Sequence, residues 1–435
     1  MTVNHIFLIS PPFYSHFTPL LSLAMGFKRA GKEVTLGCSK EFKSQVEKEG
    51  IQFYEIDISK NKNVGKAEET DQPDSERARL EEFFESTKKG AVETLITQSQ
   101  HRKKDMLHKP EELIEKIKKI GKTVDVDLYV VDILSYGVTL GLYSLNLPFV
   151  TFCPPHPNTI PAPGDYYGIP KKWPSAIPVD TAKLEKLKEV SRNTQTEFTS
   201  IFNALIEESS SSRKPIDNAF NLVSPHAVIY NYFNFDSVST TDEAPKKVFM
   251  GHCFEEEKLS SDWLEKVSGT QEKILITLGT FLSNRVDILK KLIVACQKYN
   301  PNALLIVSAG SNAEKLKKYQ SDLVMIESFI PQKALMPYVD TVIFHGGCNT
   351  FTEAMFYAKP MVILPFSSDQ FNIAYDAERK NLAQILDPNT FEESNLVKAL
   401  ETIKKQSNEE LLYWSNISKQ RGPDYAVQHV LDQLK

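Results

Sequence analysis

Apolar residues recur in the first half of the chain as short runs separated by amphipathic or polar stretches. The runs with the length of buried strands are 5–10, 32–38, 50–56, 127–131, 147–152 and 226–231. Between the first two runs, residues 20–31 place apolar side chains at helical spacing and end at Gly31. Buried strands that alternate with helices are typical of a parallel α/β sheet.

A second series of the same kind follows the polar, turn-rich segment 234–247, which we interpret as a domain linker. Its predicted strands are 273–280, 303–310, 323–329, 341–344 and 361–366, and its predicted helices include 286–299 and 351–358. The pattern therefore predicts an α/β fold with two doubly wound sheets. We expect an N-terminal domain at 1–240, a C-terminal domain at 241–408, and a helical segment at 409–435 that packs back toward the N-terminal domain.

Two charged stretches, 61–119 and 180–214, interrupt the first series and carry apolar residues near helical spacing, so helical insertions are expected. The apolar stretch 128–152 contains Asp132, Asn146 and Pro148, which favours strand, helix, strand over a membrane span.

Composition narrows the function classes. A chain of 435 residues exceeds one ordinary core, and a net charge of −5 argues against a nucleic-acid surface. Five scattered cysteines form no CxxC pair, and the apolar run 6–9 is too short for a signal-peptide core, so a cytoplasmic location is expected. The absence of GxGxxG and of a P-loop motif weakens dinucleotide oxidoreductase and ATPase interpretations.

The stretch FHGGCNTFTEAMFYAKP, residues 344–360, places a polar cluster between a predicted strand and a predicted helix. Ligands bind beyond the carboxyl ends of strands in open α/β sheets, and helix N-terminal amides face anions. His345 in this turn suits donation to phosphate oxygens. Thr350 and Glu353 fit a capping box, and helix capping and ligand binding both stay open for Glu353.

Catalysis requires a proton acceptor, and His16 is the candidate in the N-terminal half. We expect His16 in a loop, PPFYSHFTP, at the carboxyl end of the first strand, while Asp132 ends the fourth strand at the same edge. A histidine in a loop is more often a surface residue without a catalytic role, and an acidic residue at a strand end is more often simply solvated. If the two meet, the carboxylate orients the imidazole and stabilises its charged form.

Residues 329–374 resemble the donor-binding motif of family 1 nucleotide-sugar glycosyltransferases of the GT-B fold, close to the bacterial macrolide-glycosyltransferase-like branch. The stretch PPFYSHFTPLLSLA resembles the acceptor-side histidine loop of the same family, part of the UDP-glycosyltransferase superfamily. The resemblance implies two Rossmann-like domains that face each other across a cleft. Phe329 stands where plant members have tryptophan.

The resemblance also implies a role for each residue that matches the motif. Phe329 and Gln332 lie near the nucleotide base, His345 with the amides of Gly347, Asn349 and Thr350 holds the diphosphate, Thr280 adds a phosphate contact, Glu353 binds the ribose hydroxyls, and Asp369 with Gln370 binds the sugar hydroxyls. His16 is the general base, and Asp132 is its partner.

The implied function is an inverting hexosyltransferase that moves a sugar, glucose being the first choice, from a UDP- or dTDP-sugar to a hydroxyl of a small lipophilic or phenolic acceptor. No cofactor, metal, nucleic acid or membrane span is expected, and the protein is expected to be a monomer or a weak homo-oligomer. Asp125 and Asp127 match an Asp-x-Asp metal motif of another glycosyltransferase fold, but they precede their strand, away from the crevice. A sugar-nucleotide epimerase of the same fold and a non-catalytic nucleotide-sugar-binding protein are the alternatives.

Overall fold

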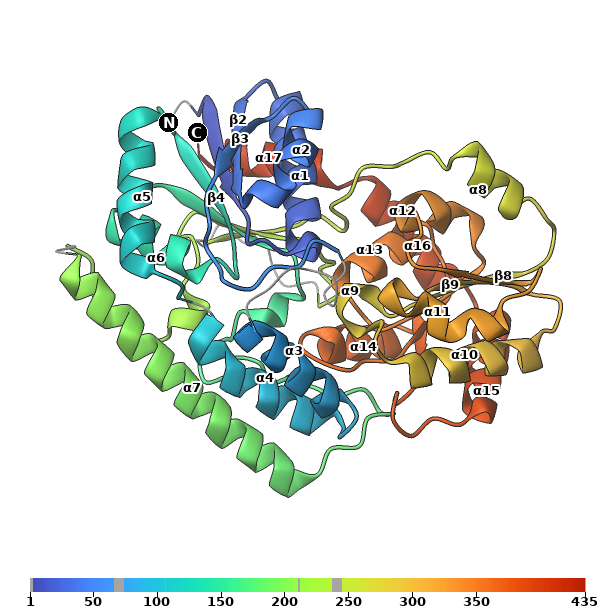
Figure 1. Cartoon of the computed structure of the whole chain (residues 1–435). Coiled ribbons are helices and arrows are strands. Elements are labelled where there is room, and N and C mark those ends of the chain that lie inside the picture. Colours follow the sequence, from blue (N-terminus) through green and yellow to red (C-terminus); the bar gives the residue numbers. More distant parts are fainter. Residues whose placement is uncertain (1–2, 66–73, 106, 210–211, 237–244, 435) are drawn as a thin grey trace.

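The computed structural model describes residues 3–65, 74–105, 107–209, 212–236 and 245–434. Two α/β domains lie side by side, each built on a twisted sheet with helices packed on both faces (Figure 1). The polar stretch around residue 240, part of the predicted linker, lies outside the described residues. The predicted fold class of two doubly wound domains is confirmed.

The N-terminal sheet has seven parallel strands in the order β3-β2-β1-β4-β5-β6-β7. The strands are β1 (His5–Ile9), β2 (Glu33–Cys38), β3 (Gln52–Glu55), β4 (Leu128–Asp132), β5 (Phe149–Cys153), β6 (Ala227–Tyr230) and β7 (Lys246–Phe249). The last strand was not expected, because Lys246 and Lys247 belong to the polar stretch that we interpreted as linker. It extends the N-terminal sheet to Phe249, beyond the boundary expected at residue 240.

The C-terminal sheet has six parallel strands in the order β10-β9-β8-β11-β12-β13. The strands are β8 (Lys273–Thr277), β9 (Leu304–Ser308), β10 (Val324–Glu327), β11 (Thr341–Phe344), β12 (Met361–Ile363) and β13 (Ala383–Ile385). Side chains alternate between the two faces of each sheet. On β8, for example, Ile274 and Ile276 enter one apolar cluster and Leu275 enters the other.

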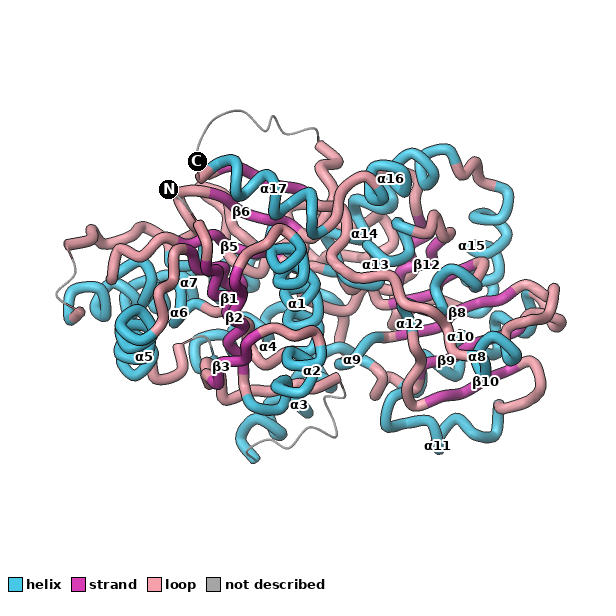
Figure 2. The backbone as a smooth tube through the Cα atoms, turned by 90° about the horizontal axis from the view of Figure 1, so that it is seen from above, coloured by secondary structure: helices cyan, strands magenta, loops and turns pink. Residues whose placement is uncertain are grey.

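Helices cover both sheets, and Figure 2 shows them around the strands. In the N-terminal domain they are α1 (Tyr14–Arg29), α2 (Lys43–Lys48), α3 (Asp74–Thr87), α4 (Ala91–Asp105), α5 (Pro110–Thr123), α6 (Tyr136–Ser144) and α7 (Thr181–Glu208). In the C-terminal part they are α8 (Ser261–Lys266), α9 (Gly279–Leu282), α10 (Val286–Tyr299), α11 (Ala313–Leu316), α12 (Gln332–Leu335), α13 (Cys348–Phe356), α14 (Gln370–Arg379), α15 (Glu393–Lys405), α16 (Glu409–Lys419) and α17 (Pro423–Gln433).

Both charged insertions are helical, as expected, because they contain α3, α4, α5 and α7. The apolar stretch 128–152 forms β4, α6 and β5. None of the described helices has the length and apolar character needed to cross a membrane. The five cysteines are buried and unpaired.

The chain crosses between the domains at two places that touch each other. It leaves β7 for α8 through the segment 250–260, and it returns between α16, which packs on α13, and α17, which packs on α1. At the return, the Gly422 amide donates to the Met250 carbonyl oxygen (2.8 Å), and Arg421 donates to the Phe249 carbonyl oxygen (3.1 Å). The C-terminal helix therefore lies on the N-terminal domain.

Candidate active site

A cavity of about 350 Å³ opens where the carboxyl ends of the two sheets face each other. Segments that follow β1, β4 and β5 line it from one side, and segments that follow β11 and β12 line it from the other. It brings together His16, His345, Gly347, Asn349, Asp369 and Gln370 among the predicted site residues. A doubly wound fold places ligands at this edge of its sheets.

His16 and Asp132 form a hydrogen-bonded pair at the N-terminal side of the cavity. The His16 Nδ1 atom lies 2.9 Å from Oδ2 of Asp132, whose side chain is fully buried and whose Oδ1 accepts from the Leu134 amide (2.8 Å). A carboxylate only accepts, so Nδ1 carries the proton and donates. In a neutral imidazole, Nε2 is then the basic nitrogen, and it has no hydrogen-bond partner among the described residues.

The expectation that His16 lies in a loop is wrong, because α1 begins at Tyr14 and places His16 in its first turn. Pro19 lies inside this helix, where its missing N–H leaves the Ser15 carbonyl without its usual partner. The Asn349 side chain, from α13 of the other domain, donates to that carbonyl over 2.9 Å. The Asn349 side chain also accepts from Asn231 (3.1 Å), so it binds the N-terminal domain. The backbone N–H of Asn349, by contrast, lies in the first turn of α13.

His345 follows β11 and packs between two glycines. A Cβ atom added at Gly279 or Gly347 would lie 2.5 Å or 2.4 Å from the imidazole, so only glycine leaves room at these positions. Burial lowers the pKa of His345 to about 4, and Nδ1 has no hydrogen-bond partner among the described residues. The ring is therefore neutral at pH 7 and has one N–H to donate beside the N-terminus of α13.

Gln332, Thr350 and Glu353 form a separate hydrogen-bonded cluster that does not line the cavity. Gln332 Nε2 donates to Glu353 (2.6 Å) and to Thr350 Oγ1 (3.1 Å). The capping-box alternative for Glu353 is wrong, because α13 is N-capped by Gly347 and has no side-chain cap. Burial raises the pKa of Glu353 to about 7, while the Gln332 hydrogen bond and the Lys333 charge oppose that rise.

The remaining residues predicted to bind the nucleotide-sugar differ in how exposed their side chains are and in which hydrogen bonds they already make. Phe329 is 65% exposed, and Thr280 lies in α9 with a side chain outside the described part of the structure. Asp369 accepts from the His156 amide through Oδ2 (2.9 Å), and burial raises its pKa. Gln370 accepts from the amides of Phe366 and Ser367 (2.9 and 3.1 Å), so its side chain builds the turn before α14.

Sequence reasoning missed His156, although it follows β5 by three residues and the strand-end signal used for Asp132 applies to it. Its Nδ1 accepts from the Asn158 amide (3.0 Å), so Nε2 carries the proton that is donated to Asp376 (3.0 Å). Tyr232 also donates to Asp376 (3.3 Å). This buried network joins the β5 loop to α14.

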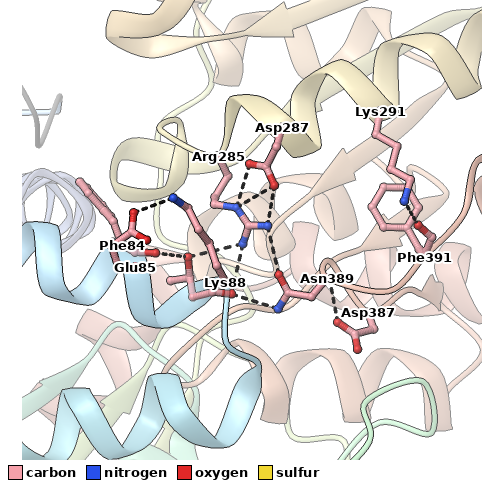
Figure 3. Close-up of polar contacts among 10 residues, drawn as sticks. Phe84, Glu85, Lys88, Arg285, Asp287, Lys291, Asp387, Asn389 and Phe391 are labelled. Carbon is pink, nitrogen blue, oxygen red and sulfur yellow. Dashed lines mark hydrogen bonds and ion pairs between the residues drawn. The ribbon is translucent and has the colours of Figure 1, made fainter.

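The outer wall of the cavity is formed by α3 and α4, and the C-terminal domain holds these helices. Arg285, 3% exposed, donates to the Thr87 carbonyl at the end of α3 (3.1 Å), and Asn389 donates to the same oxygen (3.0 Å). Figure 3 shows Arg285 between Asp287 and Asn389. A cation at a helix C-terminus is favourable, because the helix dipole is negative there.

The cavity wall is largely apolar. Phe13, Phe83 and Tyr167 line the cavity, whereas Phe17, Tyr136 and Phe152 are core residues. Aliphatic side chains of the wall include Leu80, Leu95, Leu134, Ile169 and Leu282.

Asp127 has a structural role at the start of β4, away from the cavity. Its Oδ2 accepts from the amides of Asn4 and His5 (2.7 and 2.9 Å). In the described part of the chain, no group of three or more His, Cys, Asp or Glu side chains is placed to hold a metal ion. A metal-free reaction stays a prediction.

Two family models match the chain. The model of UDP-glucoronosyl and UDP-glucosyl transferases matches residues 219–427, and the model of the glycosyltransferase family 28 N-terminal domain matches residues 16–119. The first match includes α13 and Asp369, and the second begins at His16.

Curated relatives and solved structures that resemble this chain are also named as glycosyltransferases. An NDP-glycosyltransferase, YjiC, of Bacillus subtilis is 22% identical over 95% of this chain and 91% of its own. Demethyllactenocin mycarosyltransferase of Streptomyces fradiae is 24% identical over 44% of this chain and 38% of its own. Five curated relatives align over only 30–38% of their own length. The crystal structure of the glycotransferase of kitacinnamycin has a TM-score of 0.67 at 17% identity, covering 100% of this chain and 99% of that chain.

Proposed function

Since this chain belongs to the UDP-glycosyltransferase superfamily and has the GT-B fold, we propose that it is an inverting glycosyltransferase that uses His16 as general base. The donor is a UDP- or dTDP-sugar, with glucose as the first choice, and the acceptor is a hydroxyl of a small lipophilic molecule. The observation that carries the proposal is that His16, hydrogen bonded to the buried Asp132, lines the same cavity as His345 and the N-terminus of α13.

The proposed reaction is a single displacement. Nε2 of His16 takes the proton of the acceptor hydroxyl as its oxygen bonds to the anomeric carbon, and the bond from that carbon to the diphosphate breaks. Attack on the face opposite the leaving group inverts the configuration. Asp132 stabilises the imidazolium that forms, because its buried carboxylate lies against Nδ1.

Negative charge develops on the departing diphosphate, and groups of the C-terminal domain are placed to meet it. The first amides of α13 have no intrahelical partners, and the helix dipole is positive at this end. The neutral imidazole of His345 adds one donor beside them. Such fixed donors stabilise charge that appears in the transition state.

The apolar wall supports a lipophilic acceptor. The similarity of this chain to demethyllactenocin mycarosyltransferase and to the glycotransferase of kitacinnamycin supports a natural-product aglycone. Five unpaired buried cysteines are compatible with the reducing cytoplasm, which remains the proposed location.

The test is incubation of the protein with UDP-glucose or dTDP-glucose and a panel of phenols, macrolides and terpenoids, read by mass spectrometry. A product heavier than its acceptor by one hexosyl residue, which is hexose less one water, supports the proposal. Conversion of the sugar nucleotide without an acceptor would indicate an epimerase instead. Nucleotide binding with no turnover of any kind would indicate a non-catalytic binding protein.

A further inference from the structure

The turn before α14 holds a residue in an uncommon backbone conformation. Ser368 has φ +52°, in the left-handed region that non-glycine residues seldom occupy. Such a conformation persists where its surroundings fix it, and it tends to mark functional positions. Asp369, which lines the cavity, is the next residue, so the conformation of Ser368 decides where that carboxylate points.

A side chain from the other domain holds Ser368. Gln98, on α4, accepts from the Ser368 amide through Oε1 (3.1 Å) and donates from Nε2 to Ser368 Oγ (2.9 Å). The backbone N–H can only donate, so it fixes which end of the Gln98 amide is oxygen. The two hydrogen bonds are therefore reciprocal, and they define the orientation of both partners.

The Asp369 carboxylate is held on one oxygen and open on the other. Its Oδ2 accepts from the amide of His156, another N-terminal-domain residue, whereas Oδ1 has no hydrogen-bond partner among the described residues. A carboxylate oxygen that faces a cavity accepts hydroxyl donors, so it suits a polyol such as a sugar.

Apolar packing holds α4 in place independently of Gln98. The Phe371 ring, fully buried, lies in one cluster with Val92, Leu95 and Ile96 of α4. Loss of the Gln98 amide therefore removes the hydrogen bonds to Ser368 while α4 stays packed on α14.

We propose that Gln98 is a positioning residue for the sugar of the nucleotide-sugar donor, because it fixes the Ser368 turn and thereby the Asp369 carboxylate. The sugar subsite is then built by both domains, with Gln98 and His156 supplied by the domain that holds the acceptor. This inference rests on the proposed function. It predicts that Gln98 affects binding of the sugar and not of the nucleotide, because Gln98 is hydrogen bonded to Ser368 and not to His345 or the α13 amides that we propose for the phosphates.

The experiment measures binding of UDP and UDP-glucose, and of dTDP and dTDP-glucose, by calorimetry to the wild type and to Gln98→Ala. Gln98→Ala is expected to weaken binding of the sugar nucleotide about 10-fold and to leave binding of the free nucleotide within about twofold. Gln98→Glu should restore part of the affinity, because a carboxylate accepts from both the amide and the hydroxyl of Ser368. Gln100→Ala, at an exposed position of the same helix, is the matched control and should change neither affinity.

Equal sugar-nucleotide affinity in Gln98→Ala and the wild type would overturn the inference while leaving the proposed function intact. If no nucleotide binds the wild type, the proposed function fails, and hydrogen–deuterium exchange tests the positioning by itself. Exchange at residues 366–370 should rise in Gln98→Ala and stay unchanged in Gln100→Ala. Unchanged exchange in Gln98→Ala would also overturn the inference.

Discussion

The Asn349 side chain donates a 2.9 Å hydrogen bond to the Ser15 carbonyl oxygen, joining α13, the helix proposed to face the diphosphate, to α1, the helix that carries His16. The acceptor oxygen is available because Pro19 cannot bond to it within α1. The Asn349 side chain therefore helps to fix the position of the proposed base relative to the proposed phosphate site.

Asn349→Ala should slow transfer by about 5-fold to 30-fold, since it removes the hydrogen bonds to Ser15 and Asn231, each of which contributes roughly 1 kcal/mol. UDP affinity should stay near that of the wild type, because the backbone amide of residue 349 is retained. Initial rates and calorimetry measure the two effects. Equal loss of rate and of UDP affinity would mean that the side chain acts on the nucleotide and not on the alignment of the helices.

His16→Ala should keep donor affinity and lose transfer to hydroxyl acceptors by roughly 100-fold to 10,000-fold, because it removes the proton acceptor. Asp132→Asn should lose less, since the imidazole remains while its orientation and charge stabilisation are weakened. The double variant should be less than additive, as expected for residues that act as one unit. Initial rates at saturating donor check all three variants. A His16→Ala enzyme with the wild-type rate would refute the mechanism and leave the fold untouched.

Glu353 should make the protein less stable as pH rises toward neutrality. Its pKa is about 7 in the folded chain against an ordinary value of 4.5, so the folded state binds more protons between these values. Stability therefore falls as pH rises from 4.5 through 7. Glu353→Gln, which can still accept from Gln332, should be more stable than the wild type at pH 8 by on the order of 1–3 kcal/mol. At pH 4.5 the two proteins should unfold at the same temperature, and parallel thermal unfolding profiles over the whole range would contradict the assignment.

Arg285→Met should loosen α3, because the Thr87 carbonyl keeps only its bond from Asn389. We expect the free energy of unfolding to fall by roughly 1–3 kcal/mol, which is the cost of leaving a buried polar group without one of its hydrogen bonds. Limited proteolysis should cut faster within residues 74–105. Lys298→Met, which removes an exposed ion pair with Glu393, is the control and should change neither unfolding nor cleavage.

Removal of divalent metal ions should leave the transfer rate unchanged, because the proposed phosphate site meets charge with helix amides and His345. The measurement compares initial rates in buffer, in EDTA, and in EDTA followed by excess magnesium or manganese. A rate that falls in EDTA and returns with either ion would show that the diphosphate needs a metal.

The sequence predicted elements and turns well where each depends on neighbouring residues. The polar cluster of 344–360 is visible because two apolar runs enclose it, and the long strands follow from their own periodicity. The strands β7 and β13 were missed because four or three residues carry too little pattern to distinguish an edge strand from a linker. The start of α1 was placed too late because Pro19 was interpreted as part of a loop. In the structure Pro19 lies inside the helix, and Asn349 supplies the hydrogen bond to the Ser15 carbonyl that Pro19 cannot donate.

The partnerships that build the cavity could not be predicted in the same way. Gln98 and Ser368 are 270 residues apart, and Arg285 and Thr87 are 198 apart. No local pattern distinguishes Gln98 from Gln100, since both are polar residues of one helical insertion. Only the packing of α4 on the other domain shows which of them has a partner.

The paired crossings near Met250 and Gly422 determine how the two domains can move. Both connections pass through the same small region and are hydrogen bonded to each other, so they act as one pivot. We expect relative motion of the domains to be a rotation about that pivot, with a displacement that grows with distance from it. The Arg285 contact with Thr87 and the Gln98 contact with Ser368 join the domains through α3 and α4, away from that pivot, and such contacts must part before the cavity can widen to admit a donor and release a nucleotide. The rate of that opening can limit turnover even where the chemistry is fast.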